Sequence, residues 1–319
     1  MQARLGVIRA GEQPAEAIAG HSLAALDRPL APSIAAELWV AIASTGALLL
    51  GAFQRDAGLP DVELPLLRRG SGGPEVRIGP GTVHVALALS HPGALVPCDE
   101  KRIVNRSVRP LLRGLTKTGS LAHFFGRDWI SVGNRPVGWV GFAHDSTSRR
   151  TVFEAFIAVQ TPFALDQRPS FLGKSPATLD TLAGGIVSAR RIADAIVESY
   201  VAASGGEAAD LPGPAGAHGP HGAKEGNEDA RADPPWTATR VEAIGSVGAG
   251  RDARGNFRVG GDLLVSRDAL ARLETRIDVT SDPEIGALVD ETLGAPGVAI
   301  DGIRSLKSVR DVILDARRV

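Results

Sequence analysis

The sequence predicts an α+β protein with a second, smaller unit at its C-terminus. Short apolar stretches rich in β-branched and aromatic residues follow one another between Gly and Pro residues, with few helical stretches between them. Strands in runs favour an α+β arrangement over a doubly wound sheet. A segment at 204–235, rich in Gly, Ala, Pro, Asp and Glu, has almost no large apolar side chain and divides the chain.

Strands account for most of the predicted elements before that segment. Five apolar stretches are predicted as strands, at Ala47–Leu50, Val83–Leu89, Trp129–Val132, 137–142 and 152–159. A helix is predicted over 15–26, directly after Pro14. A second helix is indicated by apolar side chains at three- to four-residue spacing, namely Ile186, Ala189, Ile192, Ala193, Ile196 and Tyr200.

Three helical faces are predicted beyond the segment at 204–235. The first follows Ser266 as its predicted N-cap, the second follows a capping box from Ser281 to Glu284, and the third is near the end of the chain. Their apolar residues are Leu270, Leu273 and Ile277, then Ile285, Leu288, Val289 and Leu293, then Ile303, Leu306, Val309 and Ile313. We therefore expect a body at 1–203, a flexible linker at 204–235 and a small accessory domain at 236–319.

Composition and net charge exclude several classes of function. With 44% hydrophobic residues among 319, the chain is long enough to bury a substantial core. Because 35 Lys+Arg balance 36 Asp+Glu, overall charge points neither to nucleic acid nor to a membrane surface, and any anion site must be local. The lone Cys98 excludes an intramolecular disulfide. No apolar run at the N-terminus suits a signal peptide, so we expect a cytoplasmic protein.

Residues 68–82 form the most informative stretch, which we call the glycine loop. It places two arginines and a serine before paired glycines and then an apolar strand. Glycine lets backbone N–H groups approach a phosphate or carboxylate, and arginine adds a planar fork of donors, so this chemistry favours an anion. The alternative is an arginine-flanked surface turn. The spacing is not that of a P-loop or of a dinucleotide-binding fingerprint.

The glycine loop resembles the Arg-Arg-x-Ser-Gly-Gly-Gly-x-Val loop of lipoate protein ligases, members of the biotin/lipoate protein ligase superfamily. Pro74 replaces the third glycine and removes one N–H donor. In that family the loop lies against the acyl-adenylate. The resemblance therefore implies a substrate- and nucleotide-binding role for Arg68, Arg69, Ser71, Gly72, Gly73 and Gly81.

Other segments follow the order of the family. The stretch that ends at Gln54 resembles its upstream Gly-x-x-Gln strand end, and the stretch from Gly126 through Asp128 resembles its Arg-Asn-Asp segment, one residue short. Residues 255–262 resemble the start of its accessory domain. The resemblance implies mixed and antiparallel sheets flanked by helices, as in class II aminoacyl-tRNA synthetases, plus a small α/β C-terminal domain. It also implies ligand-binding roles for Gln54 and Asp128.

The family's catalytic lysine has no counterpart here. The aligned residue is Arg135 or Pro136, depending on register. Arg135 would keep a positive charge, but a planar guanidinium does not replace a compact ammonium at a tightly packed position. Lys101 and Lys117 are alternative donors by proximity in sequence. Trp139, where the family uses a small residue, would either partly fill the ligand pocket or belong to the core.

The single cysteine and the histidines are the remaining candidates for a nucleophile or a metal site. Cys98 would be an acyl acceptor only in an octanoyltransferase-like reaction, and its acidic neighbours Asp99 and Glu100 disfavour the thiolate. We expect no structural metal site, because the histidines lack ligand spacing. Of the seven histidines, His84, His91, His123 and His144 show no tight ligand spacing, and His218 and His221 lie in the linker with no cysteine nearby. Asp128 is expected either to help bind Mg²⁺ through nucleotide phosphates or to cap a strand edge.

The resemblance implies ATP-dependent activation of lipoate, or a similar small carboxylic acid, to an acyl-adenylate such as lipoyl-AMP. The acyl group would then pass to a lysine of a lipoyl carrier domain protein. The missing lysine motivates a second reading, a catalytically silent relative that binds an acyl or nucleotide ligand, or a partner, and regulates lipoylation. A third reading is an octanoyl or biotin transferase. None of the three involves nucleic acid or a membrane.

Overall fold

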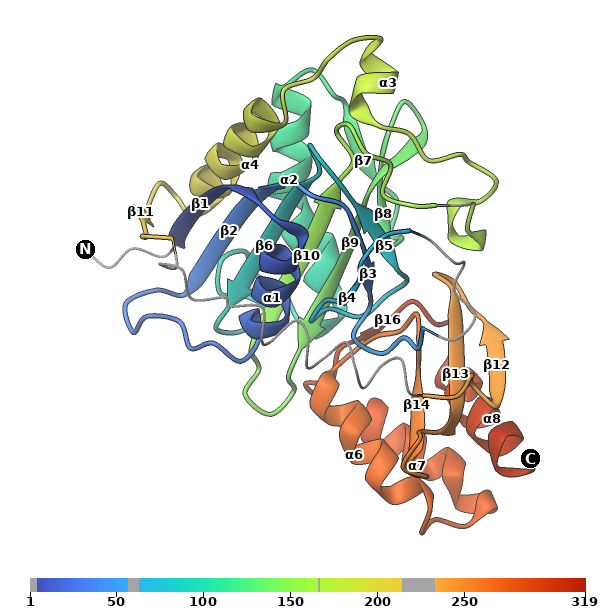
Figure 1. The fold of residues 1–319 in the computed structure, drawn as a ribbon. Coiled ribbons are helices and arrows are strands. Elements are labelled where there is room, and N and C mark those ends of the chain that lie inside the picture. The colour runs from blue at the N-terminus through green and yellow to red at the C-terminus, as the bar shows by residue number, and fades with distance from the viewer. Residues whose placement is uncertain (1–4, 57–62, 166, 214–232) are drawn as a thin grey trace.

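A large mixed sheet forms the centre of the computed structural model, which describes residues 5–56, 63–165, 167–213 and 233–319 (Figure 1). Eight strands lie in the order β11 (Ala208–Asp210), β1 (Leu5–Gln13), β2 (Ala36–Ala43), β6 (Val83–Leu89), β10 (Thr151–Ile157), β9 (Arg135–His144), β8 (Trp129–Val132) and β7 (Ala122–Phe124). Pairing is parallel from β11 to β2 and antiparallel from β2 to β7. The predicted α+β class is confirmed.

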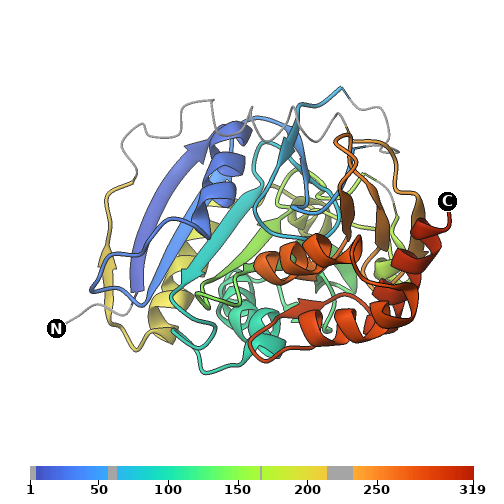
Figure 2. The ribbon, with the colours of Figure 1, turned by 90° about the horizontal axis from the view of Figure 1, so that it is seen from below.

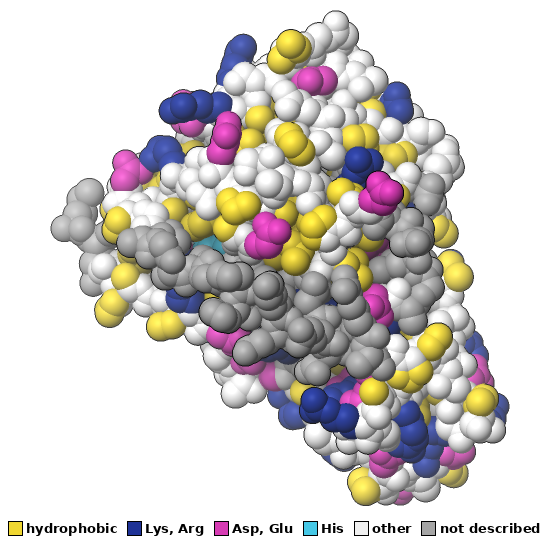
Figure 3. Space-filling view, in the orientation of Figure 1, with side chains coloured by type: hydrophobic (Ala, Val, Ile, Leu, Met, Phe, Trp, Pro, Cys, Tyr) yellow, Lys and Arg dark blue, Asp and Glu magenta, His cyan; other side chains and the backbone are white. Residues whose placement is uncertain are grey.

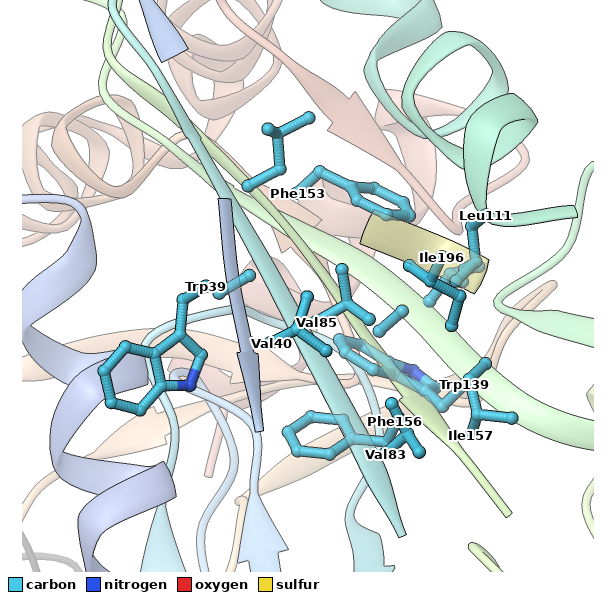
Figure 4. Packing of buried hydrophobic residues seen from close by; sticks show 14 of the residues in the cluster. Trp39, Val40, Val83, Val85, Leu111, Trp139, Phe153, Phe156, Ile157 and Ile196 are labelled. Carbon is cyan, nitrogen blue, oxygen red and sulfur yellow. The ribbon is translucent and has the colours of Figure 1, made fainter. Parts of the chain in front are cut away.

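The two faces of this sheet are covered differently. Helices α2 (Ile103–Lys117) and α4 (Ala189–Ala203) pack on one face, where Figure 4 shows Leu111 and Ile196 beside Phe153. On the other face lie α1 (Ala15–Ala25) and a three-stranded sheet of β4 (Leu66–Arg68), β3 (Ala47–Leu50) and β5 (Val76–Ile78). Figure 4 shows Trp39 pointing toward this second face. The glycine loop therefore lies on the face opposite α2 and α4.

A second apolar core belongs to the C-terminal unit, residues 236–319. It contains the sheet of β12 (Ala238–Val241), β13 (Ser246–Arg251) and β14 (Phe257–Gly261), the pair β15 (Leu264–Val265) and β16 (Ile300–Asp301), and helices α6 (Arg267–Ile277), α7 (Ile285–Leu293) and α8 (Leu306–Arg317). Ile244, Leu264 and Ala299 of this unit join the core of the body instead. The C-terminal unit therefore shares apolar packing with the body, and Figure 2 shows its ribbon lying against that of the body.

Short elements complete the part of the chain that the structure describes. They are α3 (Leu179–Ala183) and the 3-10 helices η1 (Glu100–Arg102), η2 (Pro169–Phe171) and η3 (Asp282–Glu284). No helix among the described residues is both long and apolar enough to cross a membrane.

Predicted and observed elements agree closely for the strands. The three strands predicted at Ala47–Leu50, Val83–Leu89 and Trp129–Val132 have those bounds, and 137–142 and 152–159 correspond to β9 and β10. The capping box at Ser281 is present and leads through η3 into α7. One prediction was wrong at each of three helix starts. Ile186 is 91% exposed and precedes α4, the Ser266 side chain does not cap α6, and Ile303 precedes α8.

Part of the predicted linker at 204–235 takes part in the sheet. Strand β11 pairs with β1 as its parallel edge neighbour, because Leu5 is opposite Ala208 and Val7 is opposite Asp210. Residues 214–232, including His218 and His221, lie outside the described residues. The boundaries of the linker and of the two domains remain predictions.

Candidate functional site

The first part of the glycine loop joins β4 to β5 and is packed between β9 and the C-terminal unit. The N–H of Gly72 donates to the Phe142 carbonyl at 3.3 Å, and the N–H of Gly73 donates to the Leu263 carbonyl at 2.8 Å. A Cβ on Gly72 would collide with that same Leu263 carbonyl. The glycines are therefore needed for close backbone approach, and in this conformation the approaching group is the protein's own backbone.

Arg69 is the most enclosed residue of the loop, with 0% of its surface exposed. Its guanidinium donates to the carbonyls of Leu49, Gly72 and Pro74 at 2.9, 2.7 and 2.7 Å, and Nε donates to Ser71 Oγ at 3.1 Å. Burial lowers the pKa of Arg69 to about 10, so the group stays charged at neutral pH. Through these contacts Arg69 holds the loop in its observed conformation.

The indole of Trp139 fills the space between the loop and β9. Trp139 is buried, and the Arg69 guanidinium lies 4.1 Å from its ring centroid in a cation–π contact. A Cβ on Gly73 would be 2.9 Å from the ring, and one on Gly141 would overlap it. Trp139 was expected either to fill part of the ligand pocket or to belong to the core. Its packing is that of a core residue that contacts the loop.

A buried polar chain continues from the loop into the central sheet. Ser71 Oγ donates to Glu154 Oε2, and Glu154 Oε1 is 2.8 Å from His84 Nε2. The His84 ring stacks on Phe156 with centroids 4.7 Å apart. Burial alone would raise the pKa of Glu154, but His84, Arg69 and Ser71 outweigh it and hold that pKa below its ordinary value. Glu154 is thus an ionised carboxylate inside the core.

Neither Glu154 nor the His84 contact was found by sequence reasoning. The sequence signal was a polar residue inside an otherwise apolar stretch, His84 in β6 and Glu154 in β10. Both strands are buried along their whole length. A buried carboxylate in such a strand requires partners from neighbouring elements. Those partners are 70 and 83 residues away in sequence, so their identity depends on strand register.

Gln54 and Arg68 lie on the outer side of the loop. The Gln54 amide donates to Asp262 Oδ1 at 2.6 Å, which links the body to the C-terminal unit. Nη1 of Arg68 donates to the carbonyls of Gly51 and Gln54 at 2.7 and 2.9 Å. Arg68 also lines a cavity of about 270 Å³ together with Arg55, Arg258 and Trp236. Arg68 is the loop arginine that reaches a cavity.

Asp128 is buried at the start of β8, and neither of its side-chain oxygens has a hydrogen-bond partner in the described structure. Burial raises its pKa to about 7, although the nearby positive charge of Arg168 lowers it. Nη1 of Arg168 and the Ser170 hydroxyl are also buried without a partner. No group of three or more His, Cys, Asp or Glu side chains in the described residues is arranged to hold a metal. The role of Asp128 in binding Mg²⁺ through nucleotide phosphates stays a prediction.

The other predicted site residues are dispersed. Gly81 occupies a turn before β6 with φ of +80°, beside the Gln160 side chain. Arg135 begins β9, and its guanidinium donates to the carbonyls of Ser175 and Pro176 at 3.0 and 2.8 Å. Lys101 lies in η1 and Lys117 at the end of α2. The structure does not gather these residues with Arg69 and Ser71, and their assignment to catalysis stays a prediction.

Cys98 is not an activated thiol. Burial, together with the charge of Asp99, raises its pKa to about 11, and Sγ donates to the Pro92 carbonyl at 3.0 Å. Acyl transfer through a thiolate needs a lowered pKa. The environment of Cys98 thus disfavours the transferase reading.

Comparisons with known proteins agree with the architecture. No protein family model and no curated protein matches the sequence. Among solved structures, the chain is similar to P. falciparum LipL1 in complex with lipoate, with a TM-score of 0.65 and 11% identity over 97% of this chain and 99% of that one. It is also similar to a bipartite lipoate protein ligase from Thermoplasma acidophilum, solved in a study of its lipoylation system and E2 lipoyl domain (TM-score 0.54, 13% identity, 72% and 94% covered).

A third similar structure is lipoate-protein ligase A bound with ATP, with a TM-score of 0.54 and 14% identity over 72% of this chain and 96% of that one. The chain therefore has an α+β fold of the kind seen in these lipoate protein ligases, and it covers most of the length of each of them. Identities this low establish the fold, and activity must be argued from the site.

Proposed function

We propose that this protein is a non-adenylating relative of the lipoate protein ligases that binds a lipoyl-type carrier domain and regulates lipoylation. The observation that carries the proposal is the occupation of the loop by the protein itself. Trp139 fills the space beside Arg69 and Gly73, and the loop amides donate to carbonyls of β9 and the C-terminal unit. With the Gly72 and Gly73 N–H groups and the Arg69 guanidinium engaged, these donors are not offered to an acyl phosphate.

The charges around the loop support the same reading. Arg69, the cation expected to meet the phosphate, has four protein acceptors. All of them belong to the body, so movement of the C-terminal unit would not release it. At the position of the family's lysine the chain has Arg135 or Pro136. Losing one preorganised donor typically costs about 3 kcal/mol of transition-state stabilisation, which is roughly a hundredfold in rate.

A partner-binding role is supported by what the chain retains. It keeps both the body and the C-terminal unit of LipL1, with almost the whole of each chain covered. The Thermoplasma acidophilum ligase is described with its E2 lipoyl domain. A relative that has lost acid activation while keeping this two-part framework still presents a surface for such a domain. The partner in this proposal is accordingly a lipoyl-type carrier domain.

One observation favours an active ligase as the second candidate. Asp128, Arg168 and Ser170 leave buried polar atoms without partners, and buried groups of this kind often face a ligand or ordered water. The C-terminal unit covers the loop through two hydrogen bonds, from the Gly73 N–H to the Leu263 carbonyl and from the Gln54 amide to Asp262. Both would break if that unit moved. In this reading ATP with Mg²⁺ and lipoate would bind after such an opening, with Arg135 replacing the lysine.

Acid-dependent ATP–pyrophosphate exchange separates the two candidates. Purified protein, shown to be folded by circular dichroism, is offered lipoate, octanoate and biotin separately. We expect no exchange above background with any acid. Exchange that requires Asp128, tested with Asp128→Asn, would instead establish the ligase.

A matched pair of tryptophan variants tests the role of Trp139. Trp139→Ala and Trp129→Ala each remove a buried indole from neighbouring strands, and each should cost about 3–5 kcal/mol of stability. Only Trp139→Ala empties space beside the loop. We therefore expect calorimetry to detect lipoate binding to Trp139→Ala and not to Trp129→Ala. Equal binding by the wild type would contradict the proposal.

A further inference from the structure

Helix α2 carries a row of unpaired cations that the functions above do not use. Arg102 at its N-cap is followed by Arg106, Arg109, Arg113 and Lys117, which we call the basic stripe. Steps of three and four residues place side chains on the same face of a helix, and the apolar residues of α2 are buried on the opposite face. At about 1.5 Å per residue the stripe extends for roughly 22 Å.

No ion pair in the part of the chain that the structure describes neutralises the charge of the stripe. Between Lys101 and His144 the only acidic residue is Asp128, which is buried. Among the described residues, none of the ion pairs involves a member of the stripe, and the recorded partner of Arg109 is the neutral Asn105. By contrast, Figure 3 shows acidic and basic side chains interspersed on the C-terminal unit. The chain as a whole has a net charge of −1, so this excess is local.

A cavity continues the stripe at its N-terminal end. It measures about 350 Å³, and its lining includes the cations Lys101, Arg102 and Arg106, the carboxylates Glu100 and Asp301, and the apolar Phe124, Phe142 and Ile300. Nε of Arg106 is buried there without a partner. Figure 2 shows α2 at the surface, side by side with the C-terminal segment that contributes Ile300. The stripe therefore leads into a hollow of mixed charge, in which Nε of Arg106 is a donor without a partner.

We infer that the basic stripe of α2 is the docking surface for an acidic face of a folded protein partner, the carrier domain of the proposed function. The identity of that partner rests on the proposed function, whereas the chemistry of the surface does not. Arginine, which supplies four of the five cations, presents a planar fork that pairs with carboxylates in two parallel hydrogen bonds. Such charge complementarity chiefly sets specificity and association rate.

The ends of the stripe favour a compact acidic partner over a nucleic acid. Asp194 and Glu198 of α4 line the hollow beside Lys117, and Glu100 lies at the other end, paired with Arg149. A stiff nucleic-acid duplex longer than the stripe would meet these like charges, while a carboxylate cluster on a small domain, or a flexible acidic chain that bends away beyond the stripe, would not. The apolar side of α2 is buried in the core, so the helix has no free apolar face to enter a membrane.

Two triple variants with equal change in charge test the inference. Arg102→Ala, Arg109→Ala and Arg113→Ala together remove three of the five cations of the stripe. Arg251→Ala, Arg276→Ala and Arg318→Ala remove three exposed arginines from the C-terminal unit. Binding of a fluorescent acidic lipoyl carrier domain, of poly-L-glutamate and of duplex DNA is measured by anisotropy at low and high salt.

We expect the stripe variant to bind both acidic probes at least about tenfold more weakly than wild type, with the control within about twofold and binding lost at high salt. Equal binding by wild type and stripe variant would overturn the inference, even if the carrier domain binds and the proposed function stands. Stripe-dependent binding of polyglutamate without binding of the carrier domain would leave the acidic docking surface intact and refute the proposed partner. Tighter binding of DNA than of either acidic protein probe would overturn the inference.

Discussion

At the scale of single residues, Asp128 shows how burial changes the chemistry that a sequence suggests. A carboxylate at the edge of a strand is a reasonable candidate for binding a nucleotide or its metal. In the folded protein both side-chain oxygens are buried without partners, and the pKa is raised to about 7, chiefly by burial. Below about pH 7 the protonated form of the Asp128 carboxyl is therefore favoured.

This raised pKa predicts a pH-dependent stability. Because the pKa of Asp128 is about 7 in the folded state and near 3.8 when unfolded, the folded state holds an extra proton between these values. Stability contributed by the protonated group is present below about pH 4 and is lost as pH rises through about 7, by on the order of a few kcal/mol. Urea unfolding across this range should show the decline in wild type and a flatter profile in Asp128→Asn. An exposed control, Asp194→Asn, should keep the wild-type slope, and a retained slope in Asp128→Asn would refute the assignment.

At the scale of elements, two serines that look alike in sequence have different roles. Ser281 forms a true capping box, since its N–H and hydroxyl both contact Glu284 ahead of α7. Ser266 precedes α6, but its hydroxyl accepts the Ala299 N–H at 2.8 Å and so ties the start of α6 to the strand pair β15–β16. The contact depends on a residue 33 positions away.

Different consequences follow for the two alanine variants. Ser281→Ala should cost about 1 kcal/mol, the usual effect of losing an N-cap, with local loss of hydrogen-exchange protection in α7. Ser266→Ala leaves the buried N–H of Ala299 without its partner, so it should cost about 1–3 kcal/mol and expose the segment before β16 instead. Exchange mass spectrometry distinguishes the two patterns. Loss of protection confined to α6 in Ser266→Ala would show that Ser266 is a cap after all.

The strands were predictable and helix α2 was not, for physical reasons. Strands β3, β6 and β8 are continuous apolar runs buried on both sides, so their bounds can be read from composition. Helix α2 contains Pro110 and is rich in arginine, so the spacing of its apolar residues did not stand out in the sequence. Within the candidate site, the glycine loop was identifiable from its residues. Its partners Trp139, Glu154 and Leu263 come from distant elements, so their contact with the loop could not be predicted.

At the scale of the whole molecule, the glycine loop joins the body to the C-terminal unit. Leu263 accepts from the Gly73 N–H, Asp262 accepts from the Gln54 amide, and the Gly261 N–H donates to the Phe53 carbonyl at 2.8 Å. These contacts place the backbone just after β14 directly on the loop. We conclude that the loop's glycines serve close packing between the two parts.

Substitution at Gly72 should therefore loosen the whole molecule. In Gly72→Ala the new Cβ would overlap the Leu263 carbonyl, whereas in Gly185→Ala it meets open space. Overpacking of this kind costs about 1–3 kcal/mol. We expect thermal unfolding of Gly72→Ala to begin at a lower temperature and limited proteolysis to release the C-terminal unit, while Gly185→Ala behaves as wild type. Equal stability of the two variants would show that the contact is dispensable.

The N–H groups of Gly72 and Gly73 donate to the protein's own carbonyls, and we propose that they are not available to an acyl-adenylate. NMR of protein labelled at glycine nitrogen reports the amides of Gly72 and Gly73 directly, with and without ATP, Mg²⁺ and lipoate. We predict that both amides are protected from hydrogen exchange and that the ligands change neither their shifts nor their protection. Ligand-dependent shifts of these two amides, with loss of their bonds to Phe142 and Leu263, would contradict it.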